Sequence, residues 1–307
     1  MKDSYPISLI DLDACVLNAL ELFIREGLPS LSLGSFTRPL VVGSGNAAAT
    51  GRILLEDRDA VFADESTYQN ALKAVESING AILISASGGK DAHIIAKDLK
   101  ARGLETRLLT CNPSGAAKEH VDPANVFVFP HQPEPYTYNT STYMSMILAK
   151  TKEDPQEILD HIENAVNQSL STLAVPFRDF DAFYLIVPKK FDGIRQMLTT
   201  KFVELFGRRI ARDVFTYEQA KHATTLVPTE RELFVSLGCQ NELWGQHRLN
   251  IPLPENASYG AIMAIGYYVI GKIQAAKPPW FKESVARYCE TAAKWFDTEL
   301  PIMVEYK

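Results

Sequence analysis

The chain has 307 residues, of which 46% are hydrophobic and 22% are charged, and its formal net charge is -6. This composition is that of an ordinary globular protein with enough apolar material for about two domains. The negative net charge and the lack of any run of Lys or Arg argue against a surface that binds nucleic acid. A small local set of N–H and hydroxyl donors can still hold an anion in such a protein.

The first twenty residues carry Asp3, Asp11 and Asp13, which interrupt the apolar segment that a secretory signal peptide needs. The four cysteines lie far apart with no CxxC pair, as expected for free thiols in a reducing cytoplasm. The longest apolar stretch, residues 259–271, is too short to span a bilayer. We therefore expect a cytoplasmic protein with no membrane partner.

Short β-type runs alternate with amphipathic stretches in the first half of the chain. Strands are expected at residues 38–42, 60–63, 81–85, 106–110 and 125–129. Helical patterns follow them at residues 47–56, 67–77, 91–102, from 115 onward, and at 140–150. This alternation predicts a doubly wound parallel sheet, and strands that are apolar on both faces suit a sheet covered by helices on both sides.

A second, smaller α/β pattern occupies the other half of the chain. Its strands are expected at residues 183–187, 209–214, 233–237 and 249–253, and its helices at residues 192–206, 216–225, 257–274 and 281–298. The last two strands are joined by a short segment without a helical stripe, so this domain is either trimmed or has an antiparallel edge. The expected organisation is a helical segment (1–36), a first domain (37–150), a linking helix (151–177) and a second domain (178–307).

The strongest local motif lies where the strand at residues 81–85 meets the next helix. Ser85, Ser87 and Gly88 belong to the sequence Ser-Ala-Ser-Gly-Gly-Lys, which ends at Lys90. Glycines let the backbone approach a ligand, and hydroxyls and helix N-terminal N–H groups donate to it, at the edge where open α/β sheets bind ligands. The motif predicts a phosphate site; a Ser/Gly turn that only caps the helix is the alternative.

A second glycine turn follows the first expected strand. Gly43-Ser44-Gly45-Asn46 opens the next helix, and two such turns on neighbouring strands could enclose one phosphate. Ala48 stands where the third glycine of a dinucleotide fingerprint would be, which leaves a dinucleotide site, with Asp64 as its acidic residue, as a weaker alternative.

These turns resemble the sugar isomerase (SIS) domain family, including the isomerase domain of glucosamine-6-phosphate synthase. Pro133-Glu134 followed by Thr140 resembles the family's second ligand loop. The resemblance implies two flavodoxin-like parallel-sheet domains and a phosphosugar ligand. The residues implied to contact phosphate and sugar are Gly45, Asn46, Ala47, Ser85, Ser87, Gly88, Lys90, Thr137, Asn139 and Thr140. Ala47 and Lys90 depart from the family's usual residues, so the phosphate contacts are altered.

The resemblance also implies three catalytic residues in the second half of the chain. Aldose–ketose interconversion needs a group that carries a proton between two carbons and a positive group beside the oxygen that becomes negative. Glu204 would move the proton between C1 and C2 through an enediol, His222 would open the ring, and Lys282 would stabilise the developing oxyanion. In the family the histidine can come from a partner subunit, so a homodimer is expected. The alternatives without a catalytic role are that Glu204 pairs with Arg208, that His222 caps a helix, and that Lys282 is a solvated surface charge.

Three functions follow. The first is an isomerase acting on a hexose or amino-sugar phosphate, with a fructosamine-6-phosphate deglycase as a close variant. The second is a phosphosugar sensor without turnover, and the third is a nucleotide-binding enzyme. No cofactor or metal is expected, because His120, His131 and His161 show no metal-ligand spacing, and His93 is expected on a helix face near the phosphate loop.

Overall fold

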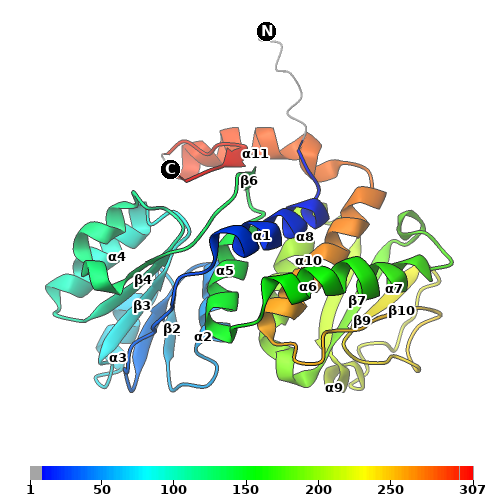
Figure 1. Ribbon diagram of the computed structural model, residues 1–307, viewed down its shortest axis with the longest axis horizontal. Coiled ribbons are helices and arrows are strands. Elements are labelled where there is room, and N and C mark those ends of the chain that lie inside the picture. Colours follow the sequence, from blue (N-terminus) through cyan, green and yellow to red (C-terminus); the bar gives the residue numbers. More distant parts are fainter. Residues whose placement is uncertain (1–8, 297, 307) are drawn as a thin grey trace, which may run out of the picture.

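A computed structural model describes residues 9–296 and 298–306 (Figure 1). The first sheet contains five parallel strands in the order β2-β1-β3-β4-β5. Its strands are β1 (Pro39–Val42), β2 (Val61–Ala63), β3 (Gly80–Ile84), β4 (Thr106–Thr110) and β5 (Val126–Val128). The helices between and after them are α2 (Asn46–Leu54), α3 (Tyr68–Ala74), α4 (Lys90–Ala101), the short η1 (Ala116–His120) and η2 (Pro123–Asn125), and α5 (Thr140–Thr151). The strand order reverses between β1 and β3, and such switch points are where open α/β sheets bind ligands.

The second sheet contains four parallel strands in the order β10-β9-β7-β8. They are β7 (Ala182–Val187), β8 (Ala211–Thr216), β9 (Glu232–Leu237) and β10 (His247–Ile251). This order repeats the first four strands of the first sheet, so the predicted pair of doubly wound, flavodoxin-like domains is confirmed, the second being trimmed by one strand. The alternative of an antiparallel edge is wrong, because β10 pairs with β9 in parallel.

A compact irregular turn replaces the helix that usually joins parallel strands between β9 and β10. The buried side chain of Asn241 organises it, accepting from the N–H groups of Leu243 and Trp244 and donating to the Trp244 carbonyl. Gly238 and Gly245 have φ values of 71° and 76°, which let the chain reverse direction at each end. The side-chain amide therefore supplies the backbone partners that a helix would otherwise provide.

Helices from both halves form one core between the sheets. They are α1 (Leu12–Glu26), α5, α6 (Pro155–His161), α8 (Arg195–Phe206) and α10 (Tyr259–Ala276). In α1, Leu12, Val16, Ala19 and Phe23 form a buried stripe at helical spacing. The long apolar stretch seen in the sequence is α10, which is buried along nearly its whole length. Among the described residues, no helix is both long and apolar enough to cross a membrane.

Two segments differ from the sequence expectation. The helix expected at residues 216–225 is only α9 (Tyr217–Ala220): a capping box between Thr216 and Gln219 starts it, and the left-handed backbone of Ala223 follows its end. The linking helix expected at residues 151–177 runs without a break as α6, a π-helical turn (η3, Ile162–Val166) and α7 (Asn167–Ser171), so it differs in this wider turn and in its earlier end. Two short helices come later in the chain: η4 (Phe177–Asp179), and η5 (Lys189–Ile194), which directly precedes α8.

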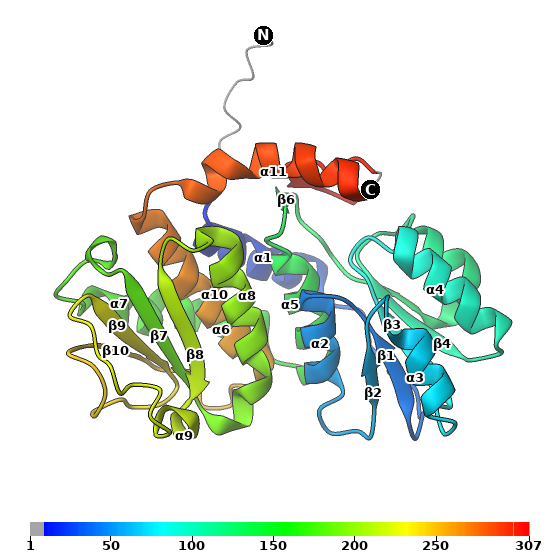
Figure 2. The ribbon, with the colours of Figure 1, turned by 180° about the vertical axis from the view of Figure 1, so that it is seen from behind.

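The carboxy-terminal segment covers one end of the molecule. The helix α11 (Trp280–Phe296) leads to β11 (Met303–Val304), which pairs antiparallel with β6 (Glu134–Pro135). Figures 1 and 2 show α11 lying across the top of the molecule, over the helices between the two sheets. The sequence pattern did not reveal this pair, because two-residue strands have no periodicity to detect.

Candidate functional site

The two glycine turns flank the switch point of the first sheet. Gly45 has a φ of 55°, which favours glycine, and Asn46 begins α2 with its side-chain Oδ1 buried and without a hydrogen-bond partner among the residues that the structure describes. A buried acceptor without a partner costs free energy. This turn therefore places an unused side-chain acceptor at the start of a helix, whereas the Ala47 N–H is already bonded to the Ser44 carbonyl.

The second turn, residues 85–89, joins β3 to α4. Ser85 Oγ accepts from the Gly88 N–H and Ser87 Oγ accepts from the Gly89 N–H, both at 3.2 Å. Because both hydroxyls act as acceptors inside the loop, their own O–H groups remain available to a ligand. Gly88 has a φ of 57°, a conformation that a side chain would strain.

The turn after β4 holds this loop by direct backbone packing. The Asn112 side-chain amide donates to the Ser87 carbonyl at 2.9 Å, and the Ala117 N–H donates to the Gly88 carbonyl at 2.9 Å. Gly115 lies so close that a Cβ there would stand 2.8 Å from the Ser87 carbonyl oxygen. The shape of the loop is therefore set by a neighbouring turn as well as by its own sequence.

A cavity of about 290 Å³ lies between the two turns. Ser44, Ala47, Ser85 and Ser87 line it from the first domain's turns, and Asn139, Tyr143 and Tyr306 close it from elsewhere. Two exposed carboxylates, those of Glu65 and Asp91, also line it, and the Ser44 hydroxyl donates to Glu65. The side chain of Lys90 lies outside the described part of the structure, so the positive charge expected from it is not placed.

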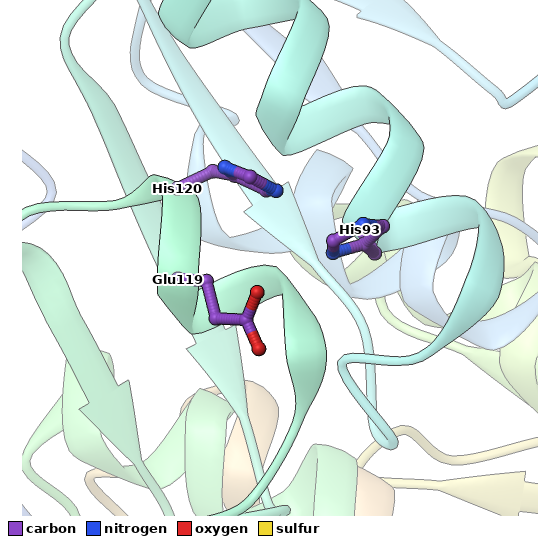
Figure 3. A group of neighbouring side chains, drawn as sticks. All are labelled: His93, Glu119 and His120. Atoms are coloured by element: carbon purple, nitrogen blue, oxygen red, sulfur yellow. The ribbon is translucent and has the colours of Figure 1, made fainter.

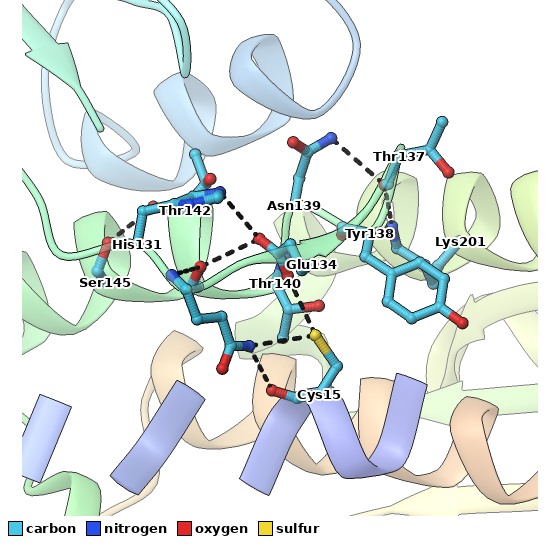
Figure 4. Close-up of polar contacts among 12 residues, drawn as sticks. Cys15, His131, Glu134, Thr137, Tyr138, Asn139, Thr140, Thr142, Ser145 and Lys201 are labelled. Carbon is cyan, nitrogen blue, oxygen red and sulfur yellow. Dashed lines mark hydrogen bonds and ion pairs between the residues drawn. The ribbon is translucent and has the colours of Figure 1, made fainter. Parts of the chain in front are cut away.

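Glu134 is the centre of a buried polar network beside this cavity (Figure 4). Its Oε2 accepts from the Thr140 N–H at 2.9 Å and from the Cys15 thiol at 3.2 Å, and its Oε1 accepts from the Ser141 hydroxyl at 3.0 Å. His131 Nε2 lies 3.4 Å from the same carboxylate, but burial lowers the pKa of His131 and favours its neutral form. Glu134 thus fixes the start of α5 and the end of the loop at residues 136–139.

That loop has a strained backbone. Thr137 and Asn139 have φ values of 75° and 48°, which are uncommon for residues with a side chain. The ammonium of Lys201, fully buried in α8, donates to the Thr137 and Tyr138 carbonyls at 2.7 Å each and to Glu204 Oε2 at 2.7 Å. Strain of this kind persists only where the surroundings hold it, and it is concentrated at functional sites.

Two of the expected sugar-binding side chains have unsatisfied hydroxyls in this loop. Among the described residues, the buried Thr137 Oγ1 and Thr140 Oγ1 have no hydrogen-bond partner, while the Asn139 side-chain amide donates to the Thr137 carbonyl at 3.3 Å. Buried polar groups in proteins are normally hydrogen-bonded, so each exception calls for an explanation. The loop therefore has two hydroxyl donors that the described part of the chain does not use.

Glu204 lies at the end of α8, where its partner is Lys201 rather than the Arg208 considered from the sequence. It lines a second cavity, of about 520 Å³, with Tyr136 and Thr137 from the strained loop and Trp280 from α11. Burial raises the pKa of Glu204, and the Lys201 ammonium offsets part of the rise. The residue is therefore a partly buried carboxylate, held by a cation, facing an open cavity.

The other two candidate catalytic residues do not line this cavity. His222 is exposed just after α9, at the carboxyl end of β8, whereas Glu204 precedes the amino end of that strand. Figure 2 shows α9 at the opposite end of the molecule from α11, and the six residues of β8 alone span about 20 Å. Lys282 is half-buried in an ion pair with Asp11 at 3.0 Å, beside the start of α1. One chain therefore does not bring these three residues together.

Lys201 and Glu134 were not singled out as site residues from the sequence. Glu134 stands inside the Pro-Glu motif, and Lys201 stands three residues before the candidate base Glu204. The signal that could have found them is the presence of a charge within an otherwise buried helix or loop, since a buried charge has to be paired.

Comparison with known proteins gives similarity in structure only. No protein-family model and no curated protein sequence matches the chain significantly. The tagatose-6-phosphate ketose/aldose isomerase of Escherichia coli superposes with a TM-score of 0.55 at 12% identity, over 88% of this chain and 89% of that chain. The C-terminal domain of the glucosamine-fructose-6-phosphate aminotransferase of Francisella tularensis gives 0.56 at 12% identity, over 86% and 93%.

A third solved structure, the glucosamine-6-phosphate deaminase of Thermotoga maritima, gives a TM-score of 0.55 at 13% identity, over 86% of this chain and 91% of that chain. The three neighbours cover almost the whole of this chain, so the similarity includes both sheets and the helices between them. The fold resemblance inferred from the glycine turns is thereby confirmed: the chain has the two-domain fold of these phosphosugar proteins.

Proposed function

We propose that this protein binds a phosphorylated sugar and moves its carbonyl between C1 and C2. The observation that carries the proposal is the pairing of two cavities across one strained loop. Asn139 faces the cavity of the two glycine turns, and Thr137 faces the cavity of Glu204. A phosphate at the first cavity and a reacting carbon near the second would use opposite ends of one small ligand.

The phosphate end relies on neutral donors. Ser85, Ser87 and the N–H groups of the turn at Gly88 would hold the phosphate, together with the turn at Gly45, Asn46 and Ala47 at the start of α2. Helix N-termini of this kind favour anions through their free N–H groups and their dipole. Thr137, Asn139 and Thr140 would contact sugar hydroxyls, and Lys90 would add its charge.

At the reacting end, Glu204 is proposed to take the proton from the carbon next to the carbonyl and return it to the neighbouring carbon. A carboxylate whose pKa is raised by burial is a better base near neutral pH than an ordinary one. The electrons of the broken C–H bond pass onto the carbonyl oxygen, and this enediolate takes up a proton from solvent to become an enediol. The hydroxyl on the neighbouring carbon then loses its proton and becomes the new carbonyl, while Glu204 delivers the proton that it carries to the former carbonyl carbon. Lys282 would reach the developing oxyanion only by leaving its pair with Asp11.

The proposed homodimer accounts for His222. Ring opening needs an acid/base near neutral pH, which suits histidine. Because His222 lies at the far end of the second sheet from Glu204 in the same chain, a partner subunit would have to supply it. Two chains related by a twofold axis would each complete the site of the other.

A sensor without turnover is the second candidate, and the position of His222 is the observation that favours it. Incubation of the protein with fructose 6-phosphate in deuterated water, followed by NMR of the C1 and C2 protons, separates the two. The isomerase is expected to exchange one of these protons for deuterium. If fructose 6-phosphate raised the melting temperature to saturation but no proton exchanged, the protein would be a sensor and not an isomerase. If a fructosamine 6-phosphate exchanged its proton and released its amine, the deglycase variant would be indicated.

Gly115→Ala tests the phosphate end. Gly115 has an ordinary φ of -62°, so the substitution adds only a Cβ against the Ser87 carbonyl and pushes the phosphate loop out of shape. We expect phosphosugar affinity to fall by at least about tenfold, which corresponds to about 1.4 kcal/mol. Thermal shift titration with fructose 6-phosphate measures it. The exposed neighbour Ala116→Ser is the control, and equal affinities in the two variants would contradict the assignment of the loop.

A further inference from the structure

A cluster of two histidines and a glutamate lies on the outer side of the first domain, apart from both cavities. His93 comes from the first turns of α4, and Glu119 and His120 come from η1 (Figure 3). Each offers one ligand atom, and these atoms all lie within 4.8 Å of one another. The sequence did not suggest this group, because His93 stands far along the chain from the other two.

The hydrogen bonding of the two imidazoles suits metal ligation. His93 Nδ1 lies 3.2 Å from the Ala116 carbonyl oxygen, so Nδ1 carries the proton and Nε2 keeps its lone pair. A metal-bound histidine almost always donates its other N–H in this way. His120 Nε2 is buried and has no hydrogen-bond partner within the described part of the chain, so a buried donor or acceptor is left unused there.

The charges around the cluster are mixed. The ammonium groups of Lys97 and Lys100 lie near His120 and oppose a cation, but both are exposed and are screened by salt. The carboxylate of Glu119 supplies an opposite charge within the cluster.

We propose that His93, Glu119 and His120 bind one Zn²⁺ ion, with solvent in the fourth position. Two imidazoles and one carboxylate are a common three-ligand set for zinc. Tetrahedral ligands about 2.0–2.1 Å from zinc lie about 3.3 Å apart, so the side chains must close inward slightly. Exposed Glu119 can do so by rotation about its side-chain bonds.

The position of the ion gives it a structural role. The backbone N–H of His93 donates to the Gly89 carbonyl at 2.7 Å, and the backbone N–H of Ala117 donates to the Gly88 carbonyl at 2.9 Å. Zinc would cross-link the two segments, α4 and η1, that hold residues 88 and 89 in place. Binding is therefore expected to stabilise this part of the first domain, whatever ligand the neighbouring loop accepts.

The test is a calorimetric titration of the full chain, freed of metal by a chelator, with zinc chloride. One zinc per chain is expected, with affinity at least about tenfold weaker in His120→Gln and in Glu119→Gln. His161→Gln is the matched control, because His161 bonds the Pro252 carbonyl away from this cluster. No binding to the wild-type chain, or equal binding by all variants, would overturn the site.

Two further measurements distinguish this site from a cysteine site and from loose surface binding. Cobalt substituted for zinc should show visible absorption without a thiolate charge-transfer band, and such a band would overturn the assignment in favour of a thiol such as Cys239. Zinc should slow hydrogen exchange in peptides covering residues 86–120 and raise the melting temperature by roughly a few degrees. Uniform or absent protection would overturn the cross-linking role.

Discussion

Lys201→Met is expected to lower the free energy of unfolding by about 3–5 kcal/mol. The variant removes a fully buried ammonium that serves the Thr137 and Tyr138 carbonyls and the Glu204 carboxylate at once. Methionine fills a similar volume, so the loss comes from leaving a carboxylate and two carbonyls without their partner and not from a cavity. Chemical denaturation of the two proteins measures the difference.

A matched control separates the buried charge from the substitution itself. Lys73 is exposed on α3, and Lys73→Met is expected to change the free energy of unfolding by no more than about 0.5 kcal/mol. If Lys201→Met were as mild as this control, the ammonium would not be holding the loop. A second readout is local: faster hydrogen exchange at residues 136–140 in the Lys201 variant, where the backbone is strained.

Glu204→Gln is expected to slow proton exchange at C1 or C2 of the sugar by about 10²- to 10⁴-fold. Glutamine keeps an oxygen that can accept from Lys201, but it leaves that buried ammonium without a counter-charge, so the free energy of unfolding should also fall. The phosphosugar affinity of the folded protein should change little while the base is lost. NMR in deuterated water measures the exchange, and the thermal shift with fructose 6-phosphate measures the binding.

Glu283→Gln is the control for this variant, since Glu283 is an exposed carboxylate that lines the same cavity. Equal exchange in both variants would remove Glu204 from the mechanism.

The wild-type rate should also fall as the pH drops through the pKa of Glu204, because a base must be deprotonated. Since burial raises that pKa above its ordinary value of 4.5, the acid limb should lie above pH 4.5.

The regular elements of this protein could be predicted because their signals are local. The strand at Thr106–Thr110 has the predicted bounds, and the other strands of the first sheet begin and end within one residue of expectation. Buried strands are apolar on both faces, glycines mark the turns after β1 and β3, and the alternation of strand and helix sets the parallel order. Each of these properties is visible within about a dozen neighbouring residues.

The parts that sequence reasoning missed depend on contacts between distant residues. Glu134 bonds to Cys15, Lys201 bonds to the Thr137 carbonyl, and His93 faces His120 across two elements. No spacing rule encodes such pairs, since the fold alone brings them together. The single useful hint was chemical: a charge within a buried segment, such as Lys201 on the inner face of α8, has to find a partner.

The two sheets point their carboxyl ends toward opposite ends of the molecule, with the phosphate turns near α11 and His222 near α9. In the proposed dimer this makes the defects of two variants complementary. A Glu204→Gln chain still offers an intact His222, and a His222→Ala chain still offers an intact Glu204. Subunits of the two inactive proteins, when mixed and allowed to reassociate, would build one competent site in each hybrid dimer. Genetic complementation between two null alleles is therefore the signature that this arrangement would leave in a cell.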